Sequence, residues 1–202
     1  MLIVFEGIDG AGKNTQVRRL LAYLRQQKAI YRVHKYPTKK AKAAFAHLSG
    51  KKTLLPGALA DVFANDIVSE KGKLEAEMRE GAIVICNRYL HSTLAYQGIG
   101  KDARKLKARI ERMGGLVPDL VILLDIDPVL SSKRKIGQKV LDRHEKDVPF
   151  LARVRKNYLS MEKTHFLSYK YAIVDASLPA DRVFTEIITC VEPLLTGRKK
   201  QK

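Results

Sequence analysis

The sequence lacks closely spaced cysteines, a membrane-length apolar run and a recognisable leader. Its 202 residues include only two cysteines, Cys86 and Cys190, which lie in apolar segments without CxxC spacing. This usage predicts buried free thiols in a reducing compartment. No apolar run approaches the length of a membrane span. Glu6 and Asp9 interrupt the N-terminal apolar stretch, which argues against a signal peptide. We therefore expect a cytoplasmic protein that does not associate with membranes.

Linkers and acidic residues are also scarce. No Pro/Ser-rich or low-complexity stretch divides the chain, so we expect a single domain over residues 1–202, with 46% hydrophobic residues to build its core. Only 21 Asp and Glu stand against 38 Lys and Arg, which gives a formal net charge of +17. The excess is spread along the chain without an aromatic-interleaved basic stripe. A polyanionic small substrate and ordinary solvation explain it better than nucleic acid binding does.

A glycine-rich loop is the most informative feature that is present. It follows an apolar strand-like run over residues 1–6 and precedes apolar residues at helical spacing over 16–24. Glycines allow successive N–H groups to converge on phosphate oxygens at a helix N-terminus, and the lysine adds charge over the β and γ phosphates. A loop without a ligand is the alternative. The predicted ATP-binding residues of this loop are Gly7, Ile8, Asp9, Gly10, Ala11, Gly12, Lys13, Asn14 and Thr15.

Asn14 departs from this motif. The position normally holds Ser or Thr, whose hydroxyl coordinates Mg²⁺. An asparagine offers a carbonyl oxygen that is longer and differently placed, so Mg²⁺ is expected to be held indirectly or by other residues. Thr15 is a weak substitute because it lies one position further round the helix.

The rest of the chain alternates between strand and helix patterns. Further strands are expected at 30–34, 82–86, 120–124 and 171–174, and helices at 56–80, 103–113, 149–166 and 179–194. Gly81 is placed to end the 56–80 helix. Strands separated by helices, the first followed by a phosphate loop, indicate an α/β fold with a parallel sheet covered on both faces.

Ligands of such sheets bind beyond the carboxyl ends of the strands. The segment 36–40 follows the second strand, and the polar segment 87–97 follows the third as a loop. Arg88 therefore stands where a ligand is expected, although an arginine there could also be a surface charge.

These passages together resemble the thymidylate kinase family of P-loop nucleoside monophosphate kinases. The resemblance rests on residues 5–16, on Asn87-Arg88-Tyr89 with Ser92 and 95–97, and on 118–128, 141–145 and 174–177. It implies a three-layer P-loop NTPase fold with a short lid at about 133–143. It also implies transfer of the γ-phosphoryl group of ATP to dTMP, giving dTDP and ADP in dTTP biosynthesis, and a homodimer.

The resemblance carries roles onto individual acceptor-site residues. Asp9 is expected near the sugar 3′-hydroxyl, Arg88 on the acceptor phosphate, and Thr93 at the thymine edge. Tyr96 is expected to crowd the sugar 2′ position. Phe63 resembles a phenylalanine of the family that stacks on thymine; the alternative is a core residue on an amphipathic helix. At position 67 the family has an arginine, and this chain has Ile67. The predicted dTMP-binding residues are Asp9, Tyr36, Pro37, Phe63, Arg88, Ser92, Thr93, Tyr96 and Gln97.

The family places a catalytic arginine either in the phosphate loop or in the lid. Because the loop position is Gly10, the lid is expected to supply the charge, from Arg134, Lys135, Lys139 or Arg143. Arg134 aligns best; a solvated helix face is the alternative for this basic run. Adenine is expected near Ala176 and Ser177. The predicted catalytic residues are Asp9, Lys13, Arg88 and Arg134.

Asn87 is a second departure, since the family has Asp there. Either Asp9 and Glu145 hold Mg²⁺ together with the substrate phosphates, with Asn14 and Asn87 beside them, or turnover is weak. The retained basic groups favour an active enzyme, because this catalysis is chiefly positioning and charge stabilisation. A kinase for another (deoxy)nucleoside monophosphate and a weakened nucleotide- or nucleic-acid-binding protein remain as alternatives.

Overall fold

A computed structural model describes residues 1–100, 102–135, 147–168 and 170–199 of the chain. Within them, five parallel strands form one sheet in the order β2-β3-β1-β4-β5. The strands are β1 (Leu2–Glu6), β2 (Tyr31–Lys35), β3 (Ile83–Asn87), β4 (Leu120–Asp125) and β5 (Tyr171–Asp175). Each lies within one residue of a run predicted from the sequence.

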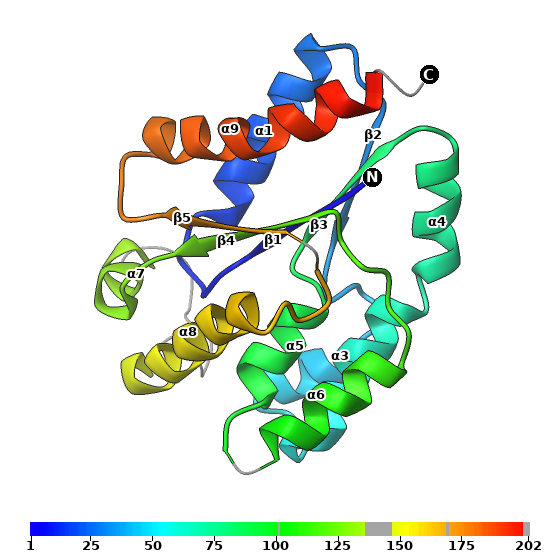
Figure 1. Ribbon diagram of the computed structural model, residues 1–202. Helices are drawn as coiled ribbons and strands as arrows, with labels where there is room; N and C mark the ends of the chain where they lie inside the picture. The colour runs from blue at the N-terminus through cyan, green and yellow to red at the C-terminus, as the bar shows by residue number, and fades with distance from the viewer. Residues whose placement is uncertain (101, 136–146, 169, 200–202) are drawn as a thin grey trace.

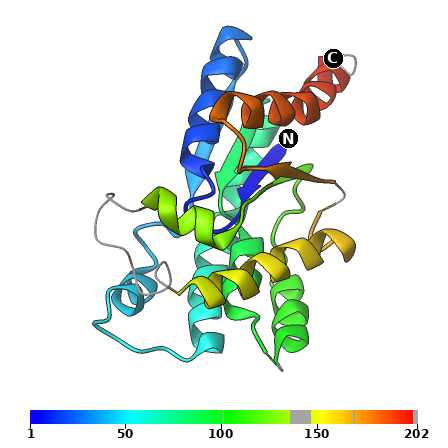
Figure 2. The ribbon, with the colours of Figure 1, turned by 90° about the vertical axis from the view of Figure 1, so that its left-hand side faces the viewer.

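Helices cover both faces of the sheet, which confirms the expected three-layer α/β fold. Figures 1 and 2 show α1 and α9 on one face and α5, α6 and α8 on the other. The described helices are α1 (Lys13–Gln26), α2 (Lys42–Leu48), α3 (Pro56–Val68), α4 (Lys71–Arg79), α5 (Leu90–Gln97), α6 (Ala103–Arg112), α7 (Pro128–Lys135), α8 (Val148–Lys163) and α9 (Ala180–Lys199). Helix α3 packs on α5, and α7 packs on α8.

The core is centred on the middle strands. Every residue of β1 and β3 is buried, as is usual for a parallel sheet covered on both sides, whereas the edge strands β2 and β5 are partly exposed. Cys86 of β3 is buried, as predicted, but Cys190 of α9 is only half-buried. The sequence prediction was wrong there because an amphipathic helix leaves part of its apolar face near the solvent.

Helices α2 and α7 were not predicted from the sequence, and two further segments differ from their predictions. The stretch 56–80 forms two helices, because the chain turns at Ser69 and Glu70; Ser69 Oγ donates to the carbonyl of Asp66 at 3.0 Å and competes with helical bonding. Gly81 then takes a positive φ of 88°. The segment 87–97, expected as a loop, contains helix α5.

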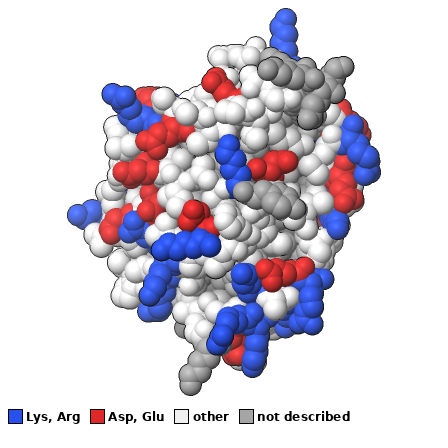
Figure 3. Space-filling view, viewed as in Figure 1, with Lys and Arg blue, Asp and Glu red and all other residues white. Residues whose placement is uncertain are grey.

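The described surface carries the basic excess of the sequence. Figure 3 shows Lys and Arg gathered on the lower part of one face, over α6, with acidic side chains among them. Several of these charges are paired: Arg109 with Asp61 at 2.6 Å, and Lys107 with Glu111 at 3.9 Å. Among the described helices, none has both the length and the apolarity needed to cross a membrane.

Candidate active site

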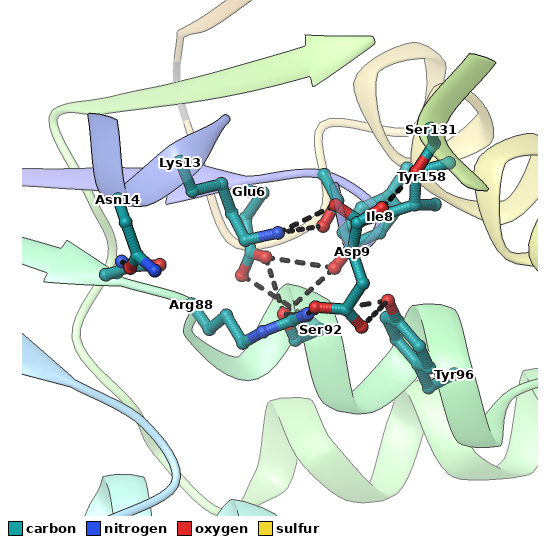
Figure 4. A network of polar contacts seen from close by, with 12 residues as sticks. Glu6, Ile8, Asp9, Lys13, Asn14, Arg88, Ser92, Tyr96, Ser131 and Tyr158 are labelled. Atoms are coloured by element: carbon teal, nitrogen blue, oxygen red, sulfur yellow. Dashed lines mark hydrogen bonds and ion pairs between the residues drawn. The ribbon is translucent and has the colours of Figure 1, made fainter. Parts of the chain in front are cut away.

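The glycine-rich loop turns from β1 into α1 around the side chain of Lys13. The Lys13 ammonium donates hydrogen bonds to the carbonyls of Gly7 at 2.7 Å and Ile8 at 2.8 Å (Figure 4). Gly10 and Gly12 have φ of 83° and 90°, a region that L side chains rarely adopt. The loop therefore has the geometry of a phosphate cradle at the start of a helix.

This loop forms one wall of a cavity of about 690 Å³, which we call the phosphate-loop cavity. Of the predicted ATP-binding residues, those lining it are Asp9, Gly10, Ala11, Gly12, Lys13, Asn14, Thr15, Arg134 and Ala176. Gly7, Ile8 and Ser177 do not line it. Residues that the sequence analysis missed also line it: Gln16, Lys35, Leu178, Pro179, Ala180 and Val183.

Arg134 connects α7 with the segment that follows β5. Its guanidinium donates to the carbonyl of Ala176 at 2.7 Å and to the carbonyl of Ser177 at 3.0 Å. The structure thus brings Arg134 to the predicted adenine end of the cavity. Lys139, Arg143 and Glu145 lie outside the described residues, as do the side chain of Lys135 and most of the predicted lid.

A second cavity of about 220 Å³, the Arg88 cavity, lies next to the first. All nine predicted dTMP-binding residues line it. Phe63 is among them, which favours the binding interpretation of this side chain over a purely core position. Lys35, Phe45, Leu48, Ile67 and Tyr89 also line it and were not predicted as site residues. Much of this wall is apolar or aromatic, as suits a planar base.

Arg88 and Asp9 meet where the two cavities join. The guanidinium of Arg88 donates to Asp9 Oδ1 at 2.5 Å, and the Tyr96 hydroxyl donates to Asp9 Oδ2 at 2.9 Å (Figure 4). Burial opposes the charge of Arg88, but Asp9 and other neighbours outweigh it and hold the guanidinium pKa above its ordinary value. Arg88 is therefore a fixed cation, with a φ of 70° that costs backbone energy.

Glu6 binds the residues that flank Arg88. The sequence analysis did not predict it as a site residue. It is fully buried and accepts bonds from the backbone N–H groups of Tyr89 at 2.7 Å and Ser92 at 3.1 Å. The hydroxyls of Ser92 and Tyr158 donate to it at 2.6 and 3.0 Å. Burial raises the pKa of Glu6. Glu6 therefore caps the N-terminus of α5. The signal available in the sequence was an acidic residue at the end of an apolar strand.

The residues predicted to hold Mg²⁺ present a sparse set of oxygen ligands. Nδ2 of Asn87 donates to Oδ1 of Asn14 at 2.7 Å. Within the described part of the chain, Asp9 is the carboxylate that lines the phosphate-loop cavity, and no group of three or more His, Cys, Asp or Glu could form a metal site. Such a set fits an ion that keeps several waters and binds mainly to substrate phosphates, as Mg²⁺ does.

Comparison with known proteins agrees with this geometry. The thymidylate kinase family model matches residues 5–187. The chain is 33% identical over 207 residues to a probable thymidylate kinase of Pyrobaculum calidifontis, covering 99% of this chain and 100% of that protein. It is 33% identical over 215 residues to a thymidylate kinase of Chlorobium chlorochromatii, covering 96% of each. A probable thymidylate kinase of Thermococcus onnurineus is 34% identical over 213 residues, covering 98% of this chain and 100% of that protein. The chain therefore belongs to the thymidylate kinase family.

Proposed function

We propose that the thymidylate kinase activity of this chain, the phosphorylation of dTMP by ATP, takes place where the two cavities meet. The observation that carries the proposal is that Asp9 and Arg88 line both cavities, so ligands in the two would approach each other there. ATP occupies the phosphate-loop cavity and dTMP occupies the Arg88 cavity. The phosphates of both then lie against the same cationic wall.

The reaction is an in-line transfer. An oxygen of the dTMP 5′-phosphate attacks the γ-phosphorus of ATP, the bond to the β–γ bridging oxygen breaks, and its electron pair stays with ADP. No general base is needed, because the attacking oxygen is already anionic. Catalysis then depends on positioning and on neutralising charge at the phosphoryl group.

Lys13 and Arg88 supply the fixed charge for the two phosphate groups. The Lys13 ammonium, held by backbone carbonyls in the loop, neutralises the β and γ phosphates. Arg88, held by Asp9, clamps the acceptor phosphate. Arg134, anchored to the segment after β5, contributes charge near ATP, with adenine at Ala176 and Ser177.

The acceptor base lies in the apolar part of the Arg88 cavity. Phe63 stacks on thymine and Thr93 contacts its edge, while Tyr96 crowds the sugar 2′ position. Ser92 and Gln97 line the side formed by α5, and Tyr36 and Pro37 line the side that follows β2. Ile67 is uncharged and cannot make a charged contact with the base. The preference for thymine then depends on the shape of the cavity and on these polar contacts.

Mg²⁺, when bound, neutralises charge on the ATP phosphates. Asp9, Asn14, Asn87 and Glu145 are the residues that we propose to hold it, mainly through water. The free cysteines support a cytoplasmic location. The resemblance to the family supports a homodimer, which light scattering of the purified chain would test.

A coupled assay of ADP release across the deoxynucleoside monophosphates tests the acceptor assignment. We expect dTMP to be the preferred acceptor, with turnover lost in Lys13→Met. Activity confined to a purine nucleotide would overturn the assignment. No turnover with dTMP, ATP and Mg²⁺, together with salt-dependent RNA binding, would favour a binding protein instead.

A further inference from the structure

Lys35, the last residue of β2, occupies an unusual place between the two cavities. Among the described residues, only Asp9, Lys35 and Arg88 line both the phosphate-loop cavity and the Arg88 cavity. Asp9 and Arg88 bind each other, so much of their charge is mutually neutralised. Lys35 is therefore the other cationic side chain at the junction.

The strand pairing fixes the base of Lys35 and leaves its ammonium available. Lys35 lies opposite Asn87 in the parallel register of β2 and β3, and the N–H of Tyr36 donates to the carbonyl of Asn87 at 3.1 Å. Because Asn87 is neutral, the register partner offers no carboxylate. None of the ion pairs among the described residues includes Lys35, and its side chain is exposed.

Position 10 of the phosphate loop has no room for a cationic side chain. A Cβ at Gly10 would lie 2.5 Å from Ser131 Oγ and 2.8 Å from the Ser131 carbonyl oxygen. The Ser131 hydroxyl also donates to the carbonyl of Asp9, which holds α7 against the loop. Position 10 therefore cannot add positive charge at the junction, whereas Lys35 at the end of β2 lines both cavities.

We propose that Lys35 is a further catalytic residue, whose ammonium contacts the transferring phosphoryl group between ATP and dTMP. The inference rests on the proposed function. As the bond from the acceptor oxygen to the γ-phosphorus forms and the bridging bond breaks, Lys35 keeps its proton and neutralises charge on the phosphoryl oxygens. Asn87 assists by being neutral, since a carboxylate there would pair with Lys35.

Steady-state kinetics of Lys35→Met, with Lys39→Met as the matched control, test the role in catalysis. Lys39 is an exposed lysine after the same strand that lines neither cavity, so its variant removes the same charge. We expect kcat of Lys35→Met to fall about tenfold or more, with both KM values changing less than about threefold. Lys35→Arg should keep most of the rate, and Lys39→Met should match the wild type.

Calorimetric titration with a dinucleoside pentaphosphate that joins adenosine and thymidine tests the position. This probe spans both cavities, whereas ADP and dTMP each occupy one. Lys35→Met should weaken the probe about tenfold and each single nucleotide less than about threefold.

A kcat within about twofold of the wild type in Lys35→Met, or an equal loss of affinity for dTMP alone and for the probe, would overturn the inference. The two proposals fail separately. If the wild-type chain does not phosphorylate dTMP, the proposed function fails. If the wild type is active and Lys35→Met is equally active, only the role of Lys35 fails. Thermal unfolding of each variant shows that the exposed substitution leaves the fold intact.

Discussion

Nδ2 of Asn87 donates a 2.7 Å hydrogen bond to Oδ1 of Asn14, joining the end of β3 to the start of α1. Both residues are departures from the motif positions at which the resemblance implies Mg²⁺ ligands. The two substitutions therefore form one neutral, hydrogen-bonded pair in the phosphate-loop cavity. With Lys13, Lys35, Arg88 and Arg134 in the same wall, the cavity has more positive than negative charge.

Asn87→Asp should weaken binding of ATP in the absence of metal. The substitution breaks the amide pair and adds a negative charge beside the polyphosphate, so we expect metal-free ATP affinity to fall about tenfold. Calorimetric titration of ATP in EDTA measures it. Asn14→Ala breaks the same hydrogen bond without adding charge and should have a smaller effect. Equal losses in the two variants would show that the bond, and not the charge, is responsible.

Arg88→Lys should impair use of dTMP while the charge is retained. A lysine has no planar fork to bind the acceptor phosphate and Asp9 together, so we expect kcat/KM for dTMP to fall about 10- to 100-fold. The KM for ATP should change little. The measurement is kinetics with each substrate varied in turn. An equal rise in both KM values would contradict a role confined to the acceptor.

Glu6→Gln should destabilise the fold and loosen the acceptor site. An amide can accept at only one end, so part of the set donated by Tyr89, Ser92 and Tyr158 loses its partner. We expect about 1–3 kcal/mol lower free energy of unfolding, measured with urea, and a higher KM for dTMP. Tyr158→Phe removes one of these bonds and should have the smaller effect. Unchanged stability in Glu6→Gln would show that the carboxylate is not required.

His91 should make the protein less stable in mild acid. It is buried against Phe166, and burial lowers its pKa from 6.5 to about 4. Between pH 6.5 and 4, His91 is therefore protonated in the unfolded chain but neutral in the folded chain. The free energy of unfolding is highest above pH 6.5 and decreases as the pH falls toward 4. The expected loss from pH 7.5 to pH 5 is about 2 kcal/mol.

Urea unfolding of the wild type and His91→Asn at both pH values isolates this contribution. The cavity left by the smaller side chain costs the same at each pH, so the comparison depends only on the titration. We expect a shallower pH dependence in the variant. Parallel pH profiles would show that His91 does not titrate in this range.

Local patterns located the strands and the phosphate loop because their signals lie within a few residues. The apolar runs of β1, β3 and β4 identify buried strands, and GxxxxGK after β1 identifies a phosphate cradle. The family resemblance then named nine residues that the structure brings around one cavity. Their contacts with dTMP remain predictions.

Contacts between distant segments were beyond such reasoning. The N-cap of α5, Tyr89, has no side-chain cap of its own. Glu6, more than eighty residues earlier, instead accepts hydrogen bonds from the N–H groups of Tyr89 and Ser92. The 56–80 pattern is continuous in hydrophobicity, yet the chain turns at Ser69. In both segments the apolar pattern carried no sign of the hydrogen bonds that the structure shows at the end or the start of a helix.

The motifs alone identify a P-loop kinase of the thymidylate kinase family, because they are local and occur in order along nearly the whole chain. Which residues meet at the junction of the two cavities depends on how the strands are arranged in the sheet. The strand order β2-β3-β1 places Lys35, Asn87 and Asp9 next to one another at the carboxyl ends of these parallel strands. Strand order depends on packing of the whole core, so no local pattern could have indicated that Lys35 lies between the two cavities.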